Sequence, residues 1–492
     1  MKAAVLWERR TPLVIEELDI ADPAPGEARV KIGVSGVCHS DLHQINRDTP
    51  SLPPLVLGHE AAGVVEAVGP GVTRVKPGDR VISAFGMRCG ECFFCLRGEY
   101  HLCAAPVPQH VRISKDGRKL NPFLAVGSFA EYANLDARNL VVIPEGMPLD
   151  AAALIACGVS TGIGAVITTA GVEPGASVVV IGIGGVGLNV VQGAALAGAA
   201  KIIAVDLHDH KLELAREFGA THGINAREGD TVERVRELTG GWGADYAFEV
   251  IGNPRTIQQA YELVRRGGAA VVVGLAPEEA EISVSAPGMM RTGKRLLGCN
   301  YGSIRPQYDI PRYVDLYLNG RIKLDELISR RFRLEEINDA FAAMEAGEVA
   351  RGGGVFDERT TLYLARPGRS EPCGSRRIAA HAIVGGTDRM HTVGDRLMAQ
   401  KVAERRRVKI SATIDPDLLE AVDAFVEEHA KFDRSKVLDE ALRLWYARQQ
   451  EQAIEAQHRA PQDDQEREEH AAWRRIQAAA AERIFRPRST DQ

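Results

Sequence analysis

Residues 176–187 read ASVVVIGIGGVG, and this stretch decides the fold of the middle of the chain. Its first half is a continuous apolar run, which is typical of a parallel strand buried on both faces. Its second half is a G-x-G-x-x-G turn that opens a predicted helix over 186–197. The turn contains four glycines, Gly182, Gly184, Gly185 and Gly187. Glycines between a strand and a helix let a pyrophosphate approach the helix N-terminus, so the stretch indicates a dinucleotide site.

Strand and helix patterns alternate beyond this turn. Strands are predicted over 200–206, 246–251 and 269–274, and helices over 211–218, 231–238 and 255–265. This alternation predicts a doubly wound parallel sheet. Asp206 ends the first of these strands at about the 20-residue distance at which a carboxylate hydrogen-bonds the adenosine ribose. Because a carboxylate there repels a 2′-phosphate, Asp206 favours NAD over NADP.

The chain as a whole has 492 residues, 45% of them hydrophobic, and a net charge of −6. This length predicts about three domains, and the composition excludes general disorder. The first residues, MKAAVLW, lack a secretory signal, and no apolar run of the roughly 18 residues that span a bilayer is evident. We therefore expect a cytoplasmic protein without a membrane segment.

A cluster of four cysteines indicates a metal site. They have the spacing C-x2-C-x2-C-x7-C and are Cys89, Cys92, Cys95 and Cys103. This spacing lets four thiolates reach one tetrahedral zinc ion from a single loop, and four sulfurs leave no open position for a substrate. The alternative is four unrelated buried cysteines, which the polar, turn-rich surroundings disfavour. The sequence therefore predicts a structural zinc site.

Three further segments suggest a second metal site. Cys38 lies in GVCHSDLH, His59 and Glu60 lie in LGHEAAG, and Cys157 lies in IACGVSTG. Two cysteines and a histidine with a vacant fourth position form a ligand set for a zinc ion that acidifies an alcohol or water. Each residue alone has a structural explanation, so the prediction depends on their occurrence together.

With these motifs in this order, residues 1 to about 360 resemble a zinc-dependent alcohol dehydrogenase of the medium-chain dehydrogenase family. The resemblance implies a GroES-like, β-rich catalytic domain over 1–158, an NAD-binding Rossmann domain over 159–300 and a return to the catalytic domain over 301–362. It also implies two zinc ions per chain and oxidation of an alcohol to an aldehyde or ketone, or the reverse, with hydride transfer to NAD. Zinc-free reductases of this fold lack Cys38, His59 and Cys157, whose presence argues against that class.

The resemblance assigns roles to individual residues. Cys38, His59 and Cys157 would bind the catalytic zinc, Glu60 would lie behind the metal, and Asp41 would orient His59. Ser40 and His43 match a proton relay, although His43 also fits a simple exposed histidine. Phe85 matches a position in the substrate pocket, and its uncharged neighbours favour an apolar alcohol or aldehyde.

Other matches concern the cofactor and the substrate. Lys211 resembles a basic residue on the adenosine side, and Arg351 an arginine that reaches the pyrophosphate. His39 stands where the family often has a pyrophosphate-binding arginine, and a solvent-facing loop residue is an equal alternative. The charged segment with Lys115, Asp116, Arg118 and Lys119 leaves a thiol-adduct substrate open.

The end of the chain has a different composition. We predict a linker over 363–404, a small module over 405–450 and a charged tail over 451–492. The module has one alternating strand and two capped amphipathic helices, and it resembles ribbon-helix-helix DNA-binding domains of repressors and antitoxins. That resemblance implies four residues facing DNA: Arg407, Lys409, Ser411 and Thr413.

Two alternatives remain for this module. It also fits a plain dimerisation appendage, and the region before it fits a read-through that joins two genes. The second functional hypothesis is therefore a DNA-binding regulator with the dehydrogenase as a fused partner. We expect a homodimer or tetramer in either case.

Overall fold

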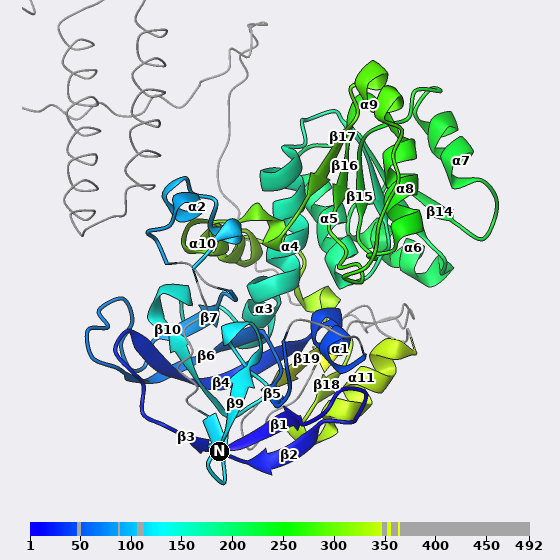
Figure 1. Ribbon diagram of the computed structural model, residues 1–492. Coiled ribbons are helices and arrows are strands. Elements are labelled where there is room, and N and C mark those ends of the chain that lie inside the picture. Colours follow the sequence, from blue (N-terminus) through cyan, green and yellow to red (C-terminus); the bar gives the residue numbers. More distant parts are fainter. Residues whose placement is uncertain (47–50, 87–88, 106–112, 347–351, 356–362, 365–492) are drawn as a thin grey trace, which may run out of the picture. The chain divides into compact units, whose positions relative to one another are not determined.

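The computed structural model describes residues 1–46, 51–86, 89–105 and 113–346, and the backbone of 352–355 and 363–364 (Figure 1). The chain divides into two units, Met1–Arg376 and Arg377–Gln492, and the second lies outside the described residues. The ribbon-helix-helix module therefore stays a prediction. Five residues with predicted roles also lie outside the described residues: Arg351, Arg407, Lys409, Ser411 and Thr413.

A six-stranded parallel sheet contains the apolar run at residues 178–181. Its strand order is β14-β13-β12-β15-β16-β17. The bounds are β12 (Ser177–Ile181), β13 (Lys201–Asp206), β14 (His222–Asn225), β15 (Ala244–Glu249), β16 (Val264–Val272) and β17 (Arg295–Gly298). The order reverses between β12 and β15, and ligands of such sheets bind at the carboxyl ends of the strands at this switch point.

Helices cover both faces of this sheet (Figure 1). They are α5 (Gly185–Leu196), α6 (Asp209–Glu217), α7 (Thr231–Leu238), α8 (Pro254–Leu263) and α9 (Ala286–Thr292). Val178 and Val180 of β12 pack into one core, and the alternate residues Val179 and Ile181 pack into another. Burial on both faces explains the uninterrupted apolar run, and the predicted doubly wound sheet is confirmed.

The predicted helix over 255–265 ends early in the structure, at Leu263. The next residue, Val264, already belongs to β16 and pairs with Ala244 at the start of β15. The backbone of Val264 is extended, with φ −80° and ψ 145°. Strand pairing therefore overrides the helical pattern of the last two residues.

The remainder of the first unit is rich in β-structure. One six-stranded sheet has the order β2-β1-β5-β9-β8-β3, with β1 (Lys2–Leu6), β2 (Val14–Glu17), β3 (Asp19–Ile20), β5 (Leu55–Val56), β8 (Ile113–Lys115) and β9 (Arg118–Pro122). An eight-stranded sheet contains β4 (Glu27–Val37), β6 (Glu60–Val68), β7 (Arg80–Ser83), β10 (Tyr132–Asp136), β11 (Leu140–Val142), β18 (Arg331–Phe332), β19 (Gly352–Val355) and β20 (Tyr363–Leu364). Strand β19 pairs with β4, so the chain returns to this sheet after the parallel one.

Short helices connect these sheets. They are α1 (His39–Asn46), α2 (Phe93–Leu96), α10 (Pro306–Leu318) and α11 (Ile337–Glu345), with one-turn segments η1 (Tyr100–Leu102), η2 (Phe123–Ala125), η3 (Ala137–Asn139), η6 (Tyr301–Ser303), η7 (Asp325–Leu327) and η8 (Leu334–Glu336). Helix α2 contains Cys95 of the four-cysteine cluster, and α1 contains Asp41, the residue predicted to orient His59.

The helical run Leu149–Ala170 is long and apolar enough to span a membrane by length and composition. It comprises α3 (Leu149–Leu154), η4 (Ile155–Val159), α4 (Ser160–Gly164) and η5 (Ala165–Ala170). The expectation that no such run exists was wrong. Most of the run is buried inside the protein, and a Cβ atom on Gly162 would lie 2.5 Å from Asn189 Cβ of α5. The run is therefore a core helix, apolar because it is packed on all sides.

Candidate metal centres and cofactor site

Four potential metal ligands from distant parts of the sequence meet in one buried cluster. Cys38 follows β4, His59 and Glu60 stand at the start of β6, and Cys157 lies in the π-helical turn η4. Their ligand atoms all lie within 4.8 Å of one another, and all four side chains are buried. A π-turn inside a helix often marks a functional position, and here it contains Cys157.

Asp41 orients the histidine of this cluster. Asp41 is fully buried in α1, and its Oδ1 accepts a hydrogen bond of 2.8 Å from the backbone N–H of Gly58. Its Oδ2 lies 3.1 Å from His59 Nδ1. Burial by itself would lower the pKa of His59, but the charge of Asp41 and the neighbouring Cys38 raise it to about 10. With Nδ1 held by Asp41, the buried Nε2, which has no hydrogen-bond partner among the described residues, is the nitrogen that would bind a metal ion.

The glycines around the cluster are required by close packing. Gly36 of β4 pairs with Glu60 of β6, and a Cβ atom on Gly36 would lie 2.0 Å from Glu60 Oε2. Gly58 has φ +88°, and a Cβ atom there would lie 2.6 Å from the backbone nitrogen of Phe129. A side chain on Gly36 would displace the Glu60 carboxylate, and one on Gly58 would clash with Phe129 and Ser128.

The chemistry of this donor set fits zinc. The neighbouring Cys38 sulfur and burial raise the pKa of Cys157 well above its usual value. Two thiols, an imidazole and a carboxylate are costly to bury together in ionised form unless a cation compensates them. Two cysteines and one histidine match a zinc site with a position left for an exchangeable ligand. The cluster can therefore hold a zinc ion that also contacts a substrate.

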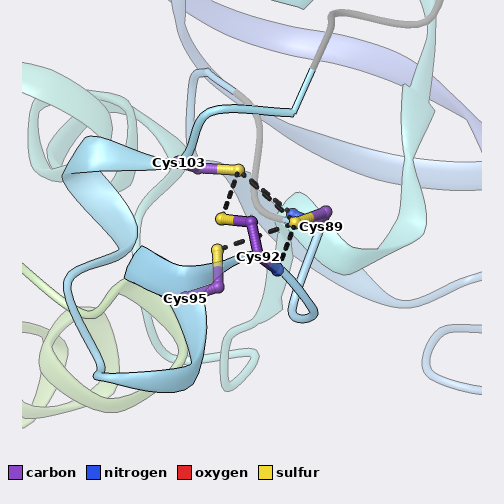
Figure 2. Close-up of side chains that lie close together, drawn as sticks. All are labelled: Cys89, Cys92, Cys95 and Cys103. Atoms are coloured by element: carbon purple, nitrogen blue, oxygen red, sulfur yellow. Dashed lines mark hydrogen bonds between the residues drawn. The ribbon is translucent and has the colours of Figure 1, made fainter. Parts of the chain in front are cut away.

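The four-cysteine loop forms a second cluster, and Figure 2 shows its sulfur atoms pointing toward one another. The Sγ–Sγ distances are 3.7 Å for Cys89–Cys103, 3.9 Å for Cys92–Cys103 and 4.0 Å for Cys89–Cys95. A tetrahedral site with Zn–S bonds of about 2.3 Å places sulfurs about 3.8 Å apart. Backbone N–H groups of Cys95 and Ala104 lower the pKa of Cys92 to about 6, which favours a thiolate. The loop can therefore hold a second zinc ion.

The predicted relay residues lie on α1. Ser40 Oγ accepts from the Cys38 thiol at 3.7 Å, so its hydroxyl lies beside the first cluster. His43 follows nearly one helical turn later and is partly buried, and its ring centroid lies 6.5 Å from that of the exposed His39. The structure thus places Ser40 at the cluster and His43 further along the same helix.

Aromatic side chains border the first cluster. The ring of Phe85 meets His59 edge to face at a centroid distance of 5.4 Å, and Phe123 does so at 5.6 Å. Tyr301 stacks on Phe85 at 3.8 Å and donates a hydrogen bond to the carbonyl oxygen of Ala156. The sequence analysis missed Phe123 and Tyr301, since no spacing in the sequence links them to Phe85.

The glycine turn lies at the carboxyl end of β12. Gly182 has φ +95°, and a Cβ atom on Gly187 would lie 2.0 Å from Gly182 O. Gly184, in contrast, faces open space, with no atom within 4 Å of a Cβ atom built there. The turn thus needs Gly182 and Gly187 for its own shape, and Gly184 leaves room for an approaching ligand.

Asp206 stands at the end of β13 beside this turn. Its carboxylate accepts backbone N–H groups of Ile183 at 2.8 Å and Leu207 at 2.8 Å. Lys211 lies in α6, which follows. The sequence analysis missed Glu249, a fully buried residue at the end of β15 whose Oε1 accepts the Gly252 N–H at 2.8 Å. Its position at the carboxyl edge could have suggested it.

The charged residues considered for a thiol-adduct pocket lie on the hairpin of β8 and β9. Lys115 forms an ion pair with Glu16, and the Arg118 guanidinium lies 5.0 Å from the centre of the Trp7 ring. These contacts tie the hairpin to the N-terminal strands of its own sheet.

Comparison with known proteins agrees with this geometry. Residues 24–145 match the alcohol dehydrogenase GroES-like domain, and 185–319 match the zinc-binding dehydrogenase domain. An NDMA-dependent alcohol dehydrogenase from Amycolatopsis methanolica is 41% identical, with 71% of this chain and 97% of the relative aligned. An S-(hydroxymethyl)glutathione dehydrogenase from Paracoccus denitrificans is also 41% identical, over 71% of this chain and 98% of its own length.

Solved structures give the same result. Benzyl alcohol dehydrogenase from Acinetobacter calcoaceticus superposes with a TM-score of 0.68 at 33% identity, covering 71% of this chain and 97% of its own. A zinc-binding dehydrogenase from Sinorhizobium meliloti bound to NADP gives a TM-score of 0.60 at 29% identity, covering 69% and 95%. The buried cysteine–histidine cluster, the four-cysteine loop and the glycine turn therefore occur in a chain that belongs to the zinc-binding alcohol dehydrogenase family.

Proposed function

We propose that this protein oxidises an alcohol to an aldehyde or ketone, or catalyses the reverse reaction, with NAD as the hydride acceptor. The observation that carries the proposal is the buried cluster of Cys38, His59, Glu60 and Cys157, whose ligand atoms lie within 4.8 Å of one another. Cys38, His59 and Cys157 would hold the metal, with Glu60 behind it. When bound, the zinc ion lowers the pKa of the substrate hydroxyl, and the nicotinamide accepts the hydride.

Residues of α1 would transfer the proton that the substrate hydroxyl releases. The Ser40 hydroxyl lies beside Cys38 and would accept the proton from the substrate hydroxyl. His43, further along α1, would pass it toward solvent. Asp41 would keep His59 in one tautomer and one orientation through Nδ1. The four-cysteine loop would hold a second zinc ion with a structural role.

The glycine turn and Asp206 would bind the cofactor. The pyrophosphate would bind at the N-terminus of α5, beside the turn formed by Gly182, Gly184, Gly185 and Gly187. The Asp206 carboxylate supports NAD over NADP, since it repels a 2′-phosphate. Lys211 and Arg351 would add contacts, and His39 would be a weaker, pH-dependent one.

The aromatic border of the cluster supports an apolar substrate. Phe85, Phe123 and Tyr301 offer ring surface beside the metal ligands. A thiol adduct, as named for the Paracoccus relative, is the second candidate. The contacts of Lys115 with Glu16 and of Arg118 with Trp7 favour the apolar alcohol, because they engage these two cations with residues of the N-terminal strands and the segment beside them.

The test is dinucleotide reduction by the purified full chain over a panel of substrates. Benzyl alcohol, ethanol and S-(hydroxymethyl)glutathione are assayed with NAD and with NADP, before and after chelation, and zinc is counted by metal analysis. We expect two zinc ions per chain, loss of turnover after chelation and a higher kcat/KM with benzyl alcohol and NAD. Turnover that survives complete removal of zinc would reject the proposal.

DNA binding by residues 405–450 rests on the sequence pattern alone. If this module binds DNA, the full chain should be retained on DNA. This retention should weaken steeply with salt and disappear when residues from about 400 onward are removed. Salt-independent retention, or none, would leave the dimerisation appendage as the explanation of this segment.

A further inference from the structure

A pocket of about 370 Å³ opens in the parallel sheet domain at the edge opposite to the glycine turn. It is lined at the turn before β15, at the start of β16 and just before β17. These strands are parallel, so the pocket lies at their amino ends, whereas the glycine turn follows the carboxyl end of β12. The helices around it, α7, α8 and α9, are drawn in green in Figure 1. The pocket is therefore separate from the proposed dinucleotide site.

The lining of this pocket carries an excess of positive charge. Arg236, Arg266 and Lys294 contribute three cations, and Glu262 is the one acidic residue among the lining side chains. In the described part of the chain, neither Arg236 nor Arg266 has an ion pair or a side-chain hydrogen bond. Arg265, adjacent in the sequence, differs in this respect, because its Nε donates to Asp245 Oδ1 at 2.6 Å. The guanidinium groups of Arg236 and Arg266 can therefore bind an external anion.

Lys294 is fixed in place within this group. Its Nζ donates to the carbonyl oxygens of Tyr261 at 3.0 Å and Glu262 at 3.2 Å, both in the last turn of α8. Partial burial and the nearby charge of Arg236 lower the pKa of Lys294. A bound anion would stabilise the charged form of Lys294 beside Arg236.

Trp242 adds a flat apolar surface to the charged lining. Its side chain is 78% exposed, although tryptophan is among the largest apolar residues, and it sits in a Gly-Gly-Trp-Gly turn. An exposed indole next to arginines is the arrangement by which proteins stack a planar ring and bind its phosphate. The volume also falls in the range of small-molecule sites, which begins near 300 Å³.

We propose that this pocket is a second, non-catalytic ligand site that binds a small phosphorylated molecule with a planar ring, of the nucleoside diphosphate class. Arg236 and Arg266 bind the phosphate oxygens, Lys294 contributes charge, and the ring stacks on Trp242. The proposal does not rest on the dehydrogenase reaction, because none of these residues belongs to the metal clusters or the glycine turn.

The test is equilibrium dialysis of ADP against the full chain at low salt. The protein is first saturated with whichever dinucleotide supports turnover, so that the glycine turn is occupied. Pyrophosphate and adenosine are measured in parallel to separate the contributions of phosphate and ring. The variants are the double variant Arg236→Ala/Arg266→Ala, Trp242→Ala and, as a matched control, Arg321→Ala, another exposed arginine.

We expect one ADP per chain in addition to the dinucleotide, with pyrophosphate and adenosine binding more weakly. The double arginine variant should lose roughly 10²-fold in affinity and Trp242→Ala roughly tenfold, while Arg321→Ala binds normally. Alcohol turnover should stay unchanged in all variants, which shows that they are folded. ADP that binds only by displacing the dinucleotide, or equally well to the double variant, overturns the site. Pyrophosphate that binds as tightly as ADP, with no effect of Trp242→Ala, overturns the assigned ligand class.

Discussion

At the scale of single residues, the contact between Asp41 and His59 predicts that Asp41 strengthens zinc binding. Replacing Asp41 by Asn keeps the size of the side chain but removes the charge that holds Nδ1. We expect Asp41→Asn to lower the affinity for one zinc ion by about 10- to 100-fold, the usual effect of losing such a partner. Competition with a chelator measures this affinity.

The control is Asp150→Asn, a carboxylate that forms an ion pair with Arg331 at 3.2 Å and belongs to neither metal cluster. It should retain both zinc ions as well as the unaltered protein does. Equal zinc retention by the two variants would show that Asp41 does not act through His59.

Ser40 allows a second test at the same scale. If its hydroxyl accepts the substrate proton, Ser40→Ala should lower kcat by roughly 10²-fold, while Ser40→Thr, which keeps a hydroxyl, should stay active. Zinc content must be equal in both variants, because the hydroxyl also contacts the Cys38 sulfur at 3.7 Å. Near-normal turnover of Ser40→Ala would remove Ser40 from the proton path.

At the scale of elements, two glycines of the same turn are expected to have different roles, one in stability and the other in NAD binding. A Cβ atom on Gly187 would lie 2.0 Å from Gly182 O, so Gly187→Ala should destabilise the protein by about 1–3 kcal/mol. A Cβ atom on Gly184 meets nothing, so Gly184→Ala should change stability by less than about 0.5 kcal/mol. It should nevertheless weaken NAD binding, because the methyl group occupies the path of the pyrophosphate.

Thermal unfolding and NAD titration measure the two effects independently. Gly184→Ala that binds NAD normally would place the pyrophosphate elsewhere than at this turn. Gly187→Ala with unaltered stability would show that the turn can relax around an added methyl group.

The four-cysteine loop is an element whose shape should depend on its metal. Cys103 comes within 4.0 Å of two partner sulfurs, so Cys103→Ser should lose one zinc ion per chain and lower the melting temperature. Cys299→Ser is the matched control, since Cys299 belongs to neither cluster and its sulfur accepts a hydrogen bond from Thr169. Metal analysis that finds both zinc ions in Cys103→Ser would contradict a four-sulfur site.

A comparison of the helices and strands with their predictions shows which elements a single sequence can reveal. Strand β12 could be predicted because residues 178–181 are apolar at every position, as burial on both faces requires. The run over 149–170 was not recognised, although it is long and apolar enough to span a membrane, because small residues and glycines in a packed core helix give no clear period. Local patterns thus identified β12, β13, β15 and β16 of this sheet, but not its edge strands β14 and β17 or the central helix.

At the scale of the whole molecule, the cluster depends on contacts that no local pattern contains. The predicted ligands are recognisable by residue type and spacing, yet β4, β6 and η4 must come together before they share one position. Tyr301 lies more than two hundred residues after Phe85 in the sequence, and the two rings still stack at 3.8 Å. Such neighbours follow from the tertiary fold, so the sequence alone could supply the metal ligands but not the aromatic border.

The division of the chain into two units predicts which part of it is needed for the dehydrogenase activity. The first unit is Met1–Arg376, and all residues proposed for catalysis, zinc or NAD precede Arg376. The Amycolatopsis relative aligns over 97% of its length with 71% of this chain, so dehydrogenases of that length lack the remaining part. We therefore expect a chain truncated after Arg376 to keep both zinc ions and an unchanged kcat/KM.

A second truncation after Arg330 tests whether the boundary is structural. It removes β18 and β19, and the loss of β19 exposes the edge of β4 with which it pairs. An unpaired edge in the middle of a sheet favours aggregation, so this shorter chain should be insoluble or lack zinc. Soluble, zinc-loaded protein ending at Arg330 would show that the returning strands are dispensable. Loss of turnover in the chain ending at Arg376 would instead show that the second unit contributes to the dehydrogenase.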